Sequence, residues 1–523
     1  MKKIFLSIFM AAAVLTSCDM DTAPKGVLTD QDGITNYIDC EAARNGVYAG
    51  MRSFGTGGYI YFTDLQMDMF IGTETNGNRN GELARGEVYS NNQDIEAVWS
   101  GVYSRIGNIN YFITQAEALL ESGTLENASR VANVKGFIAE AKFARAMYYL
   151  YLFDHFCQAY TADKATTPAL GLPLVDKYQP TPDRKSYPPR STMAKTFEFI
   201  EEDLTEAYDG LVEWEQAGHN VAAANSAYVS SYTVEALWAR AALLKRDFDT
   251  AIEKAQNVID AGIWTLTPYA QYAALWTSDQ GTELIFRPFF PNLVNTEQGA
   301  ISSTGDAWLN SNGKESDYIP SYMNCLTMYD RTTVAVGGQN RYKDVRYGTF
   351  FTQWNLKYQG SASPALVFTK YPGNAIFNSG RQEYKNMPKL FRLSELYLIV
   401  AEASYENNDE GTANTYLADL RTQRILGYDS SEEYSGTELR DEIRLERTRE
   451  LIGEGFRMSD LRRWGLGFQR NPSYPISPTL SRLFRRPEAT LQYAPNYYRF
   501  VWPIPQAEMD VNPQLKGQQN PGY

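Results

Sequence analysis

The chain has 523 residues and a formal net charge of −13, from 49 basic and 62 acidic side chains. The acidic residues are scattered and no basic block occurs, which argues against a nucleic-acid partner because phosphate backbones are bound mainly by lysine and arginine. The only two histidines are His155 and His219, so a histidine-activated nucleophile or a multi-histidine metal site is also disfavoured.

The first 17 residues have the pattern of a secretory signal peptide. Lys2 and Lys3 precede an apolar run from Ile4 to Leu15, which is too short for a bilayer span of about 20 residues. The sequence Leu-Thr-Ser-Cys that ends at Cys18 resembles a bacterial lipobox. This resemblance implies cleavage before Cys18 and acylation of its sulfur and new amino terminus, and several acyl chains together anchor a protein stably.

Residues 18–40 are predicted to form the lipidated N-terminus and a tether, because the stretch after Cys18 is polar and poor in helix formers. Asp19 and Asp21 resemble the surface-export signal of some bacterial outer-membrane lipoproteins. Removal of the signal peptide changes the formal charge to −15, since 47 basic and 62 acidic residues remain. We therefore expect a lipid-anchored outer-membrane protein that is exposed at the cell surface.

A loop from Asp68 to Glu87 is rich in glycine, asparagine, threonine and charge, and it precedes a predicted helix from Ile95 to Leu120. Loops that carry such polar side chains on a rigid scaffold commonly bind ligands. We select as candidate ligand contacts Asp68, Glu74, Asn76, Asn78 and Arg79. Trp99 lies in the helical pattern, where a core position is expected.

Two further segments predict helices that pack on one another. Residues 136–156 form one apolar helical pattern, in which His155 is expected to be packed among aromatic residues. Residues 232–262 resemble a tetratricopeptide unit, in which small residues let two helices approach closely. Because one such unit cannot bury its own apolar face, we expect the helix pairs to stack into a scaffold.

A second long loop, from Phe289 to Tyr318, places aromatic rings among serine, asparagine and glycine. A ring can pack against the C–H face of a sugar while amides and carboxylates bind its hydroxyls. Phe290 and Trp308 are therefore also candidate ligand contacts. For Trp308 the alternative is that the ring only fixes the loop to the scaffold, and Trp276, beside a helical pattern, is expected in the core.

A second helical hairpin is predicted from Leu390 to Arg424, with a polar turn at 407–409. A charged edge lies beside its apolar stripe and is formed by Arg392, Glu395 and Glu402. Such an edge is either a solvated face or part of an ion-pair network at a helix junction. We favour the network, because the facing helix offers Arg421 and Arg424.

Catalytic and cofactor motifs are absent from the sequence: no GxxxxGK[ST], GxSxG or HExxH occurs. Residues 30–33 begin like a calcium loop but lack the later glycine and carboxylate of an EF-hand. Beyond Cys18 the cysteines are odd in number and include no CxxC, which indicates neither a disulfide framework nor a zinc site. Two carboxylates could hydrolyse a glycoside, but the sequence does not place a pair across a cleft. An enzyme is the weaker hypothesis, and no cofactor is expected.

Residues 446–465 read ERTRELIGEGFRMSDLRRWG, a helix whose charges alternate in sign at steps of three and four residues. This run closely resembles a motif of the SusD/RagB family of nutrient-binding outer-membrane lipoproteins. Three other parts of the sequence are similar to that family, namely residues 136–146, 392–403 and the closing WPIPQ and QNPGY segments.

The resemblance implies a mainly α protein of tetratricopeptide-like helix pairs with long loops and little β structure. It extends over a body from 41 to 523, with an N-terminal part to about 270 and a C-terminal part from about 271. It further implies a non-catalytic protein that captures glycan and passes it to a SusC-like TonB-dependent transporter. The matched motifs belong to the scaffold and carry over no sugar contacts. RagB-like relatives take peptides, which is the alternative ligand class.

Overall fold

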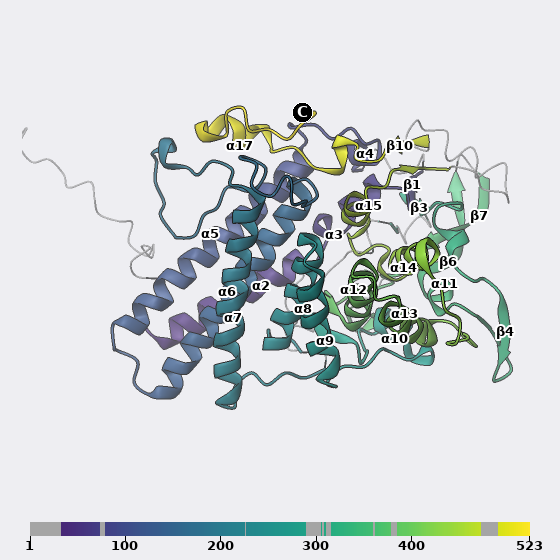
Figure 1. The fold of residues 1–523 in the computed structure, drawn as a ribbon, viewed down its shortest axis with the longest axis horizontal. Coiled ribbons are helices and arrows are strands. Elements are labelled where there is room, and N and C mark those ends of the chain that lie inside the picture. Colours follow the sequence, from purple (N-terminus) through teal and green to yellow (C-terminus); the bar gives the residue numbers. More distant parts are fainter. Residues whose placement is uncertain are drawn as a thin grey trace, which may run out of the picture.

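The computed structural model describes residues 33–73, 79–224, 226–288, 305, 308–309, 315–358, 361–377, 384–471 and 490–523. Over these ranges helices dominate, and each sheet has only two strands. Figure 1 shows the long N-terminal helices on one side of the molecule and the strands β6, β7 and β4 on the opposite side. The predicted mainly α fold with little β structure is confirmed. Among the described helices, none combines the length and apolar character needed to cross a membrane.

Long helices build the N-terminal side of the molecule. They are α2 (Tyr37–Phe54), α5 (Gln93–Glu121), α6 (Ala128–Phe156) and α7 (Met193–Gln216). Each follows a residue whose side chain accepts a hydrogen bond from a first-turn amide, which satisfies N–H groups that a helix leaves unpaired. Helix α6 packs against α2, α5, α7 and α8, so it lies at the centre of this side. The helices predicted at 95–120 and 136–156 are confirmed.

Both predicted helix pairs form, and they stack on one another. Their helices are α8 (Ser231–Lys245) with α9 (Phe248–Asp260), and α12 (Leu393–Glu406) with α13 (Glu410–Arg424). Helix α12 contacts α8, α9, α13 and α14. Small residues such as Ala239 and Ala255 are completely buried at these contacts, which lets the helix axes approach closely. The stacked scaffold expected from the sequence is therefore present.

The sequence predicts one helix for the charged run at 446–465, but the structure contains two. Helix α14 (Gly436–Leu451) ends before Ile452, and α15 (Arg457–Trp464) follows. The break contains Gly453 and Gly455, whose φ angles are +75° and +86°. A right-handed helix cannot include such backbone, and only glycine adopts it without strain.

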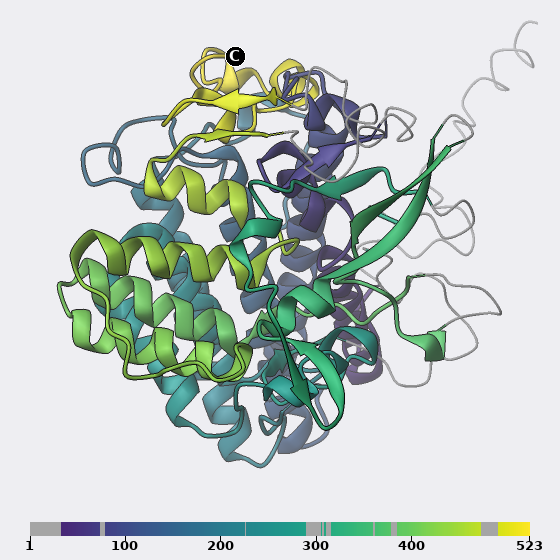
Figure 2. The same ribbon diagram turned by 90° about the vertical axis from the view of Figure 1, so that its right-hand side faces the viewer.

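The strands are short and pair antiparallel. The pairs are β1 (Phe70–Gly72) with β3 (Tyr318–Pro320), β2 (Leu284–Phe286) with β8 (Phe391–Arg392), β4 (Thr333–Val336) with β5 (Gln339–Tyr342), β6 (Phe351–Tyr358) with β7 (Ser361–Phe368), and β9 (Phe468–Gln469) with β10 (Gln492–Tyr493). Figure 2 shows the extended ribbons of the middle part of the chain standing beside the helical stack. The shorter α-helices are α3 (Gly58–Gln66), α4 (Gly81–Ala84), α10 (Ala274–Thr277), α11 (Val345–Phe350) and α17 (Gln506–Val511).

The apolar interior has a large helical cluster and a second cluster on the strand side. The helical cluster includes Trp99, which is 2% exposed, and the second includes Trp276, which is 1% exposed. His155 is also buried and stacks on the ring of Tyr151 at a centroid distance of 3.8 Å. The core positions expected for Trp99, Trp276 and His155 are confirmed.

The break between α14 and α15 generates a stability prediction. A Cβ atom at Gly455 would lie 2.8 Å from the backbone oxygen of Ile60. Gly455→Ala therefore combines a backbone cost with a backbone clash, and we expect it to lower the free energy of unfolding by about 3 kcal/mol. Urea denaturation measures this loss.

The matched control is Gly427→Ala. Gly427 also has a positive φ, +68°, but a Cβ there would meet nothing within 4 Å. It should lose only the backbone cost of roughly 1 kcal/mol. Equal losses in the two variants would contradict a role for close packing against Ile60.

Candidate functional site

The two loops chosen from the sequence meet in the structure. Strand β1 follows Asp68 and pairs with β3, which ends the second loop. The hydroxyl of Thr73 donates to the backbone oxygen of Ser316 at 2.7 Å. Arg79 lies 3.5 Å from Asp317, between Nη1 and Oδ2. Segments that are more than 200 residues apart in sequence therefore share one edge of the molecule, as the separations of 243 and 238 residues in these contacts record.

Trp308 does not face solvent, which corrects its selection as a ligand contact. The indole is 1% exposed and belongs to the strand-side core. Its ring centroid lies 5.0 Å from that of Phe368 and 5.4 Å from that of Phe70, and it stacks on Tyr371 with an interplanar angle of 13°. A ring enclosed in this way cannot stack on a sugar without leaving the core. Trp308 therefore has the alternative role, fixing the loop to the scaffold.

Asp68 is also a structural residue rather than a ligand contact. It is 4% exposed, and both of its carboxylate oxygens accept hydrogen bonds from Arg457 at 2.8 Å. By contrast, 44% of the side chain of Arg79 is exposed. Four other candidates, Glu74, Asn76, Asn78 and Phe290, lie outside the described residues, as does Cys18.

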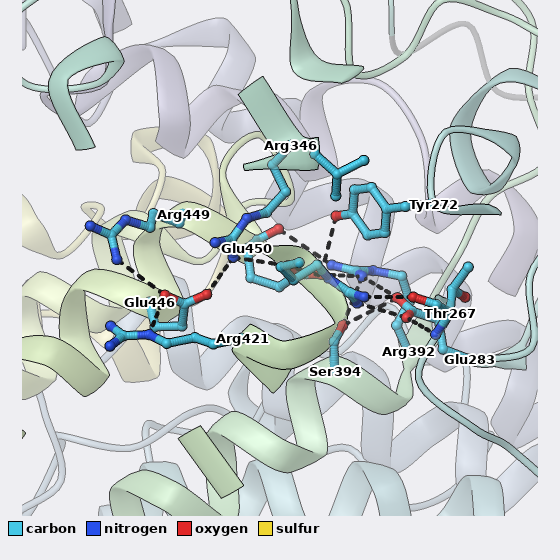
Figure 3. A network of polar contacts seen from close by, with 12 residues as sticks. Thr267, Tyr272, Glu283, Arg346, Arg392, Ser394, Arg421, Glu446, Arg449 and Glu450 are labelled. Atoms are coloured by element: carbon cyan, nitrogen blue, oxygen red, sulfur yellow. Dashed lines mark hydrogen bonds and ion pairs between the residues drawn. The ribbon is translucent and has the colours of Figure 1, made fainter. Parts of the chain in front are cut away.

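A buried ion network joins several segments of the C-terminal half (Figure 3). The carboxylate of Glu450 accepts hydrogen bonds from Arg392 at 2.9 Å, from Arg424 at 3.0 Å and from Arg346 at 3.2 Å. Glu283 receives further bonds from Arg392 and Arg424, both at 2.7 Å. The arginines and glutamates alternate, so each buried charge faces an opposite one.

The charged edge of the 390–424 hairpin thus belongs to paired networks, as we favoured, but its partners lie elsewhere. Glu395 pairs with Arg240 of α8 through two bonds of 2.7 Å, and Glu402 pairs with Arg463 of α15. Arg421 pairs with Glu446 of α14 at 3.0 Å. The glutamates of α14 therefore mediate the junction, and the two helices of the hairpin do not neutralise each other directly.

Two carboxylates of this network, those of Glu446 and Glu450, are unsuited to acid catalysis. Burial alone would raise the pKa of Glu450, but Arg424, Arg392 and Arg346 outweigh it and hold that pKa well below the ordinary value. Arg346 and its neighbours lower the pKa of Glu446 in the same way. A glycosidase acid needs a raised pKa so that it carries a proton at neutral pH. This cluster therefore supplies ion pairing and no proton donor.

A cavity of about 1070 Å³, including the part open to solvent, lies between α6, α8 and the segments 386–395 and 451–456. Rings such as Tyr59 and Trp276 line it, together with the Arg240–Glu395 ion pair. Burial lowers the pKa of His155 in its wall to about 4, so this imidazole is neutral at neutral pH. Among the described residues, the carboxamide oxygen of Asn386 has no hydrogen-bond partner. The sequence gives no sign of this cavity, because its walls come from segments far apart in the chain.

Neither metal nor thiol chemistry has a site in the described part of the chain. No group of three or more histidine, cysteine, aspartate or glutamate side chains there is placed to hold a metal ion. Cys40, Cys157 and Cys325 are buried free thiols, and burial raises the pKa of each. Such thiols are poor nucleophiles because little thiolate forms.

Comparison with known proteins assigns the chain to a family. The profile of the SusD family matches residues 326–523, and a second profile, described as starch-binding associating with outer membrane, matches residues 28–232. SusD-like protein P2 of Formosa agariphila is 26% identical to this chain, and the alignment covers 100% of both chains. The chain belongs to the SusD family.

Solved structures agree with this assignment. A SusD superfamily protein of Bacteroides thetaiotaomicron is 26% identical, with a TM-score of 0.73 over 93% of this chain and 100% of that one. A SusD-like carbohydrate binding protein of Bacteroides vulgatus shares the fold at 19% identity, with a TM-score of 0.69 over 93% of this chain and 98% of that one. In this SusD-family protein, the 446–465 and 392–403 motifs contribute Glu450 and Arg392 to the ion network. These motifs therefore form the scaffold, as the resemblance implied.

The ion network generates a second stability prediction. Glu450→Gln would leave three buried arginines with one carboxylate fewer, and we expect a loss of about 3 to 5 kcal/mol in the free energy of unfolding. Thermal or urea denaturation of the purified variant measures this. Glu433→Gln, at an exposed loop position, is the control and should change stability by less than about 0.5 kcal/mol. A Glu450→Gln variant as stable as the wild type would show that the network is dispensable.

Proposed function

We propose that this SusD-family protein is a cell-surface lipoprotein that captures oligo- or polysaccharide and delivers it to a SusC-like TonB-dependent transporter. The observation that carries the proposal is the match of residues 28–232 to the profile described as starch-binding associating with outer membrane. The Bacteroides vulgatus protein of the same fold is described as carbohydrate binding. Capture without conversion is consistent with the paired, ionised carboxylates of the C-terminal half.

We place the glycan at the loops that β1 and β3 bring together. Arg79 is the described candidate whose side chain reaches solvent, and Glu74, Asn76 and Asn78 lie between Thr73 and Arg79 in the sequence. Phe290, in the second loop, would supply the stacking ring. Trp308 and the Asp68–Arg457 pair support this edge from the core side.

The base beneath these loops is well suited to a binding role. Strands β1 and β3 are completely or almost completely buried and lie on the aromatic core around Trp308. A rigid base reduces the entropy that loop residues lose when they order around a ligand. We propose that acyl chains on Cys18 hold this platform at the outer membrane, with residues 18–40 as the tether.

The anchor is tested by Cys18→Ala. Because the proposed acylation needs the cysteine sulfur, the variant should move from the membrane fraction to the soluble fraction of the cells. Fractionation followed by immunoblotting measures the distribution. Cys40→Ala, which removes a buried thiol elsewhere, should leave the protein with the membranes. Membrane association of Cys18→Ala equal to that of the wild type would contradict lipid anchoring at this residue.

The ligand is tested with a panel of oligosaccharides and peptides, using calorimetry on the full chain carrying Cys18→Ala. We expect binding of at least one oligosaccharide and a roughly tenfold loss of affinity in Arg79→Ala, because a charge-assisted hydrogen bond is worth about 1.5 kcal/mol or more. Arg440→Ala is the matched control, since Arg440 is also a partly exposed arginine beside a carboxylate.

Three results would contradict the proposed function or the proposed site. Binding of peptides alone would assign the protein to the RagB-like ligand class. New reducing ends after incubation with the bound oligosaccharide would instead establish a glycoside hydrolase. Normal affinity in Arg79→Ala would move the site away from the β1–β3 edge.

A further inference from the structure

An aromatic concavity lies on the helical side of the molecule, formed by elements other than the β1–β3 edge. It is bounded by the start of α2, the start of α6, the end of α7 and the residues His219, Asn220 and Tyr228, and it encloses about 600 Å³, including the part open to solvent. No local sequence pattern indicates this concavity, because its four contributing segments are far apart in the N-terminal half.

Arg44 forms the floor of the concavity, and aromatic rings surround its guanidinium group. The guanidinium carbon of Arg44 lies 4.5 Å from the ring centroid of Phe137 and 5.0 Å from that of Tyr228. Two hydrogen bonds of 2.5 and 2.6 Å join this guanidinium to Glu140, which is completely buried. The cation is therefore neutralised from below, and the ring faces that Arg44 contacts are not available to a cationic ligand.

One wall is held rigidly by Trp214. Its Nε1 donates to the side-chain oxygen of Asn133 at 3.0 Å, and the ring of His219 stacks on it at 5.9 Å with an interplanar angle of 19°. A Cβ atom at Gly136 would come within 2.3 Å of the indole. Gly136 is the first residue of the 136–146 motif. Its lack of a side chain allows Trp214 to lie against α6.

The rim carries hydrogen-bonding groups that are still available. Within the described ranges, the hydroxyl of Tyr228 and the imidazole nitrogens of His219 make no hydrogen bond, and Tyr228 is 41% exposed. Asn220 uses its amide nitrogen on the backbone oxygen of Val229, which leaves its carbonyl oxygen for a ligand. Glu41, also at the rim, is exposed and accepts one long bond of 3.4 Å from Tyr37.

We propose that this concavity binds one pyranose unit of a neutral glycan. The exposed ring of Tyr228 supplies a face for the sugar C–H groups, while Glu41, Asn220 and His219 surround it with acceptors and donors for hydroxyls. An anionic sugar is disfavoured, because Arg44 is already paired with Glu140 and the remaining rim charge, Glu41, is negative.

This second site does not depend on the loop site. It is formed mainly by helices and not by the loops at the β1–β3 edge. It holds one sugar unit, and not the end of a glycan chain or part of a transporter. On a polymeric ligand, two sites on one molecule make the second binding event intramolecular, which raises the overall affinity without any new contact.

The test uses methyl glucoside, methyl galactoside, methyl mannoside and methyl xyloside with the full chain carrying Cys18→Ala. Saturation-transfer NMR should detect binding of at least one of them. Tyr228→Ala should weaken it roughly threefold to tenfold, and Tyr228→Phe should retain the stacking and most of the affinity. Tyr89→Ala, which removes a tyrosine that is 50% exposed elsewhere, should have no effect.

Specific outcomes overturn the proposal. It fails if none of the four glycosides binds, if methyl glucuronide binds in their place, or if Tyr228→Ala binds as the wild type does while its melting temperature is unchanged. Arg79→Ala separates the two sites: glycoside binding that persists in this variant supports the concavity, and glycoside binding lost with Arg79 assigns the signal to the β1–β3 edge instead.

Discussion

Neutralisation of buried charge at Glu450 is the constraint on which the C-terminal half depends. Arg346, Arg392 and Arg424 approach this carboxylate from three separate parts of the chain. A buried charge without a partner costs several kcal/mol of folding free energy. Each arginine is therefore stable in the interior only in the arrangement that pairs it with this carboxylate. The network thereby fixes the relative positions of α11, α12, α13 and α14 more specifically than apolar packing would, since apolar contacts have no direction.

The same electrostatic linkage continues to the edge where we place the ligand. Arg392 also binds Glu454, at 2.5 and 3.0 Å, between the two glycines of the break. Beyond the break, Arg457 binds Asp68 just ahead of β1. The 446–465 motif therefore connects the helical stack to the base of the loops where we place the ligand. In the proposed function, this motif supports the site although none of its residues touches the sugar.

Local patterns made the helical part predictable and left the site unpredictable. The regular spacing of small apolar residues along each helix, such as Ala239 in α8 and Ala255 in α9, depends only on neighbouring turns of that helix. Both helix pairs could therefore be located from the sequence. The predicted single helix does not account for the break at 452–456 between α14 and α15, although Gly453 and Gly455 are residues that indicate such a break. Asp68 and Trp308 were misassigned because their partners, Arg457 and Phe368, lie far along the chain. Polarity or aromaticity in a loop does not reveal which side chains turn inward, and the concavity above Arg44 has no local signature at all.

The inward position of Trp308 has a consequence for protein engineering. Because the indole and the Asp68–Arg457 pair secure β1 and β3 from beneath, the position of these two strands depends on contacts from the core side. A library that varies the exposed Arg79 while it keeps Trp308, Asp68 and Arg457 would retain those contacts. The fold thus offers a rigid framework on which recognition of chosen saccharides can be engineered.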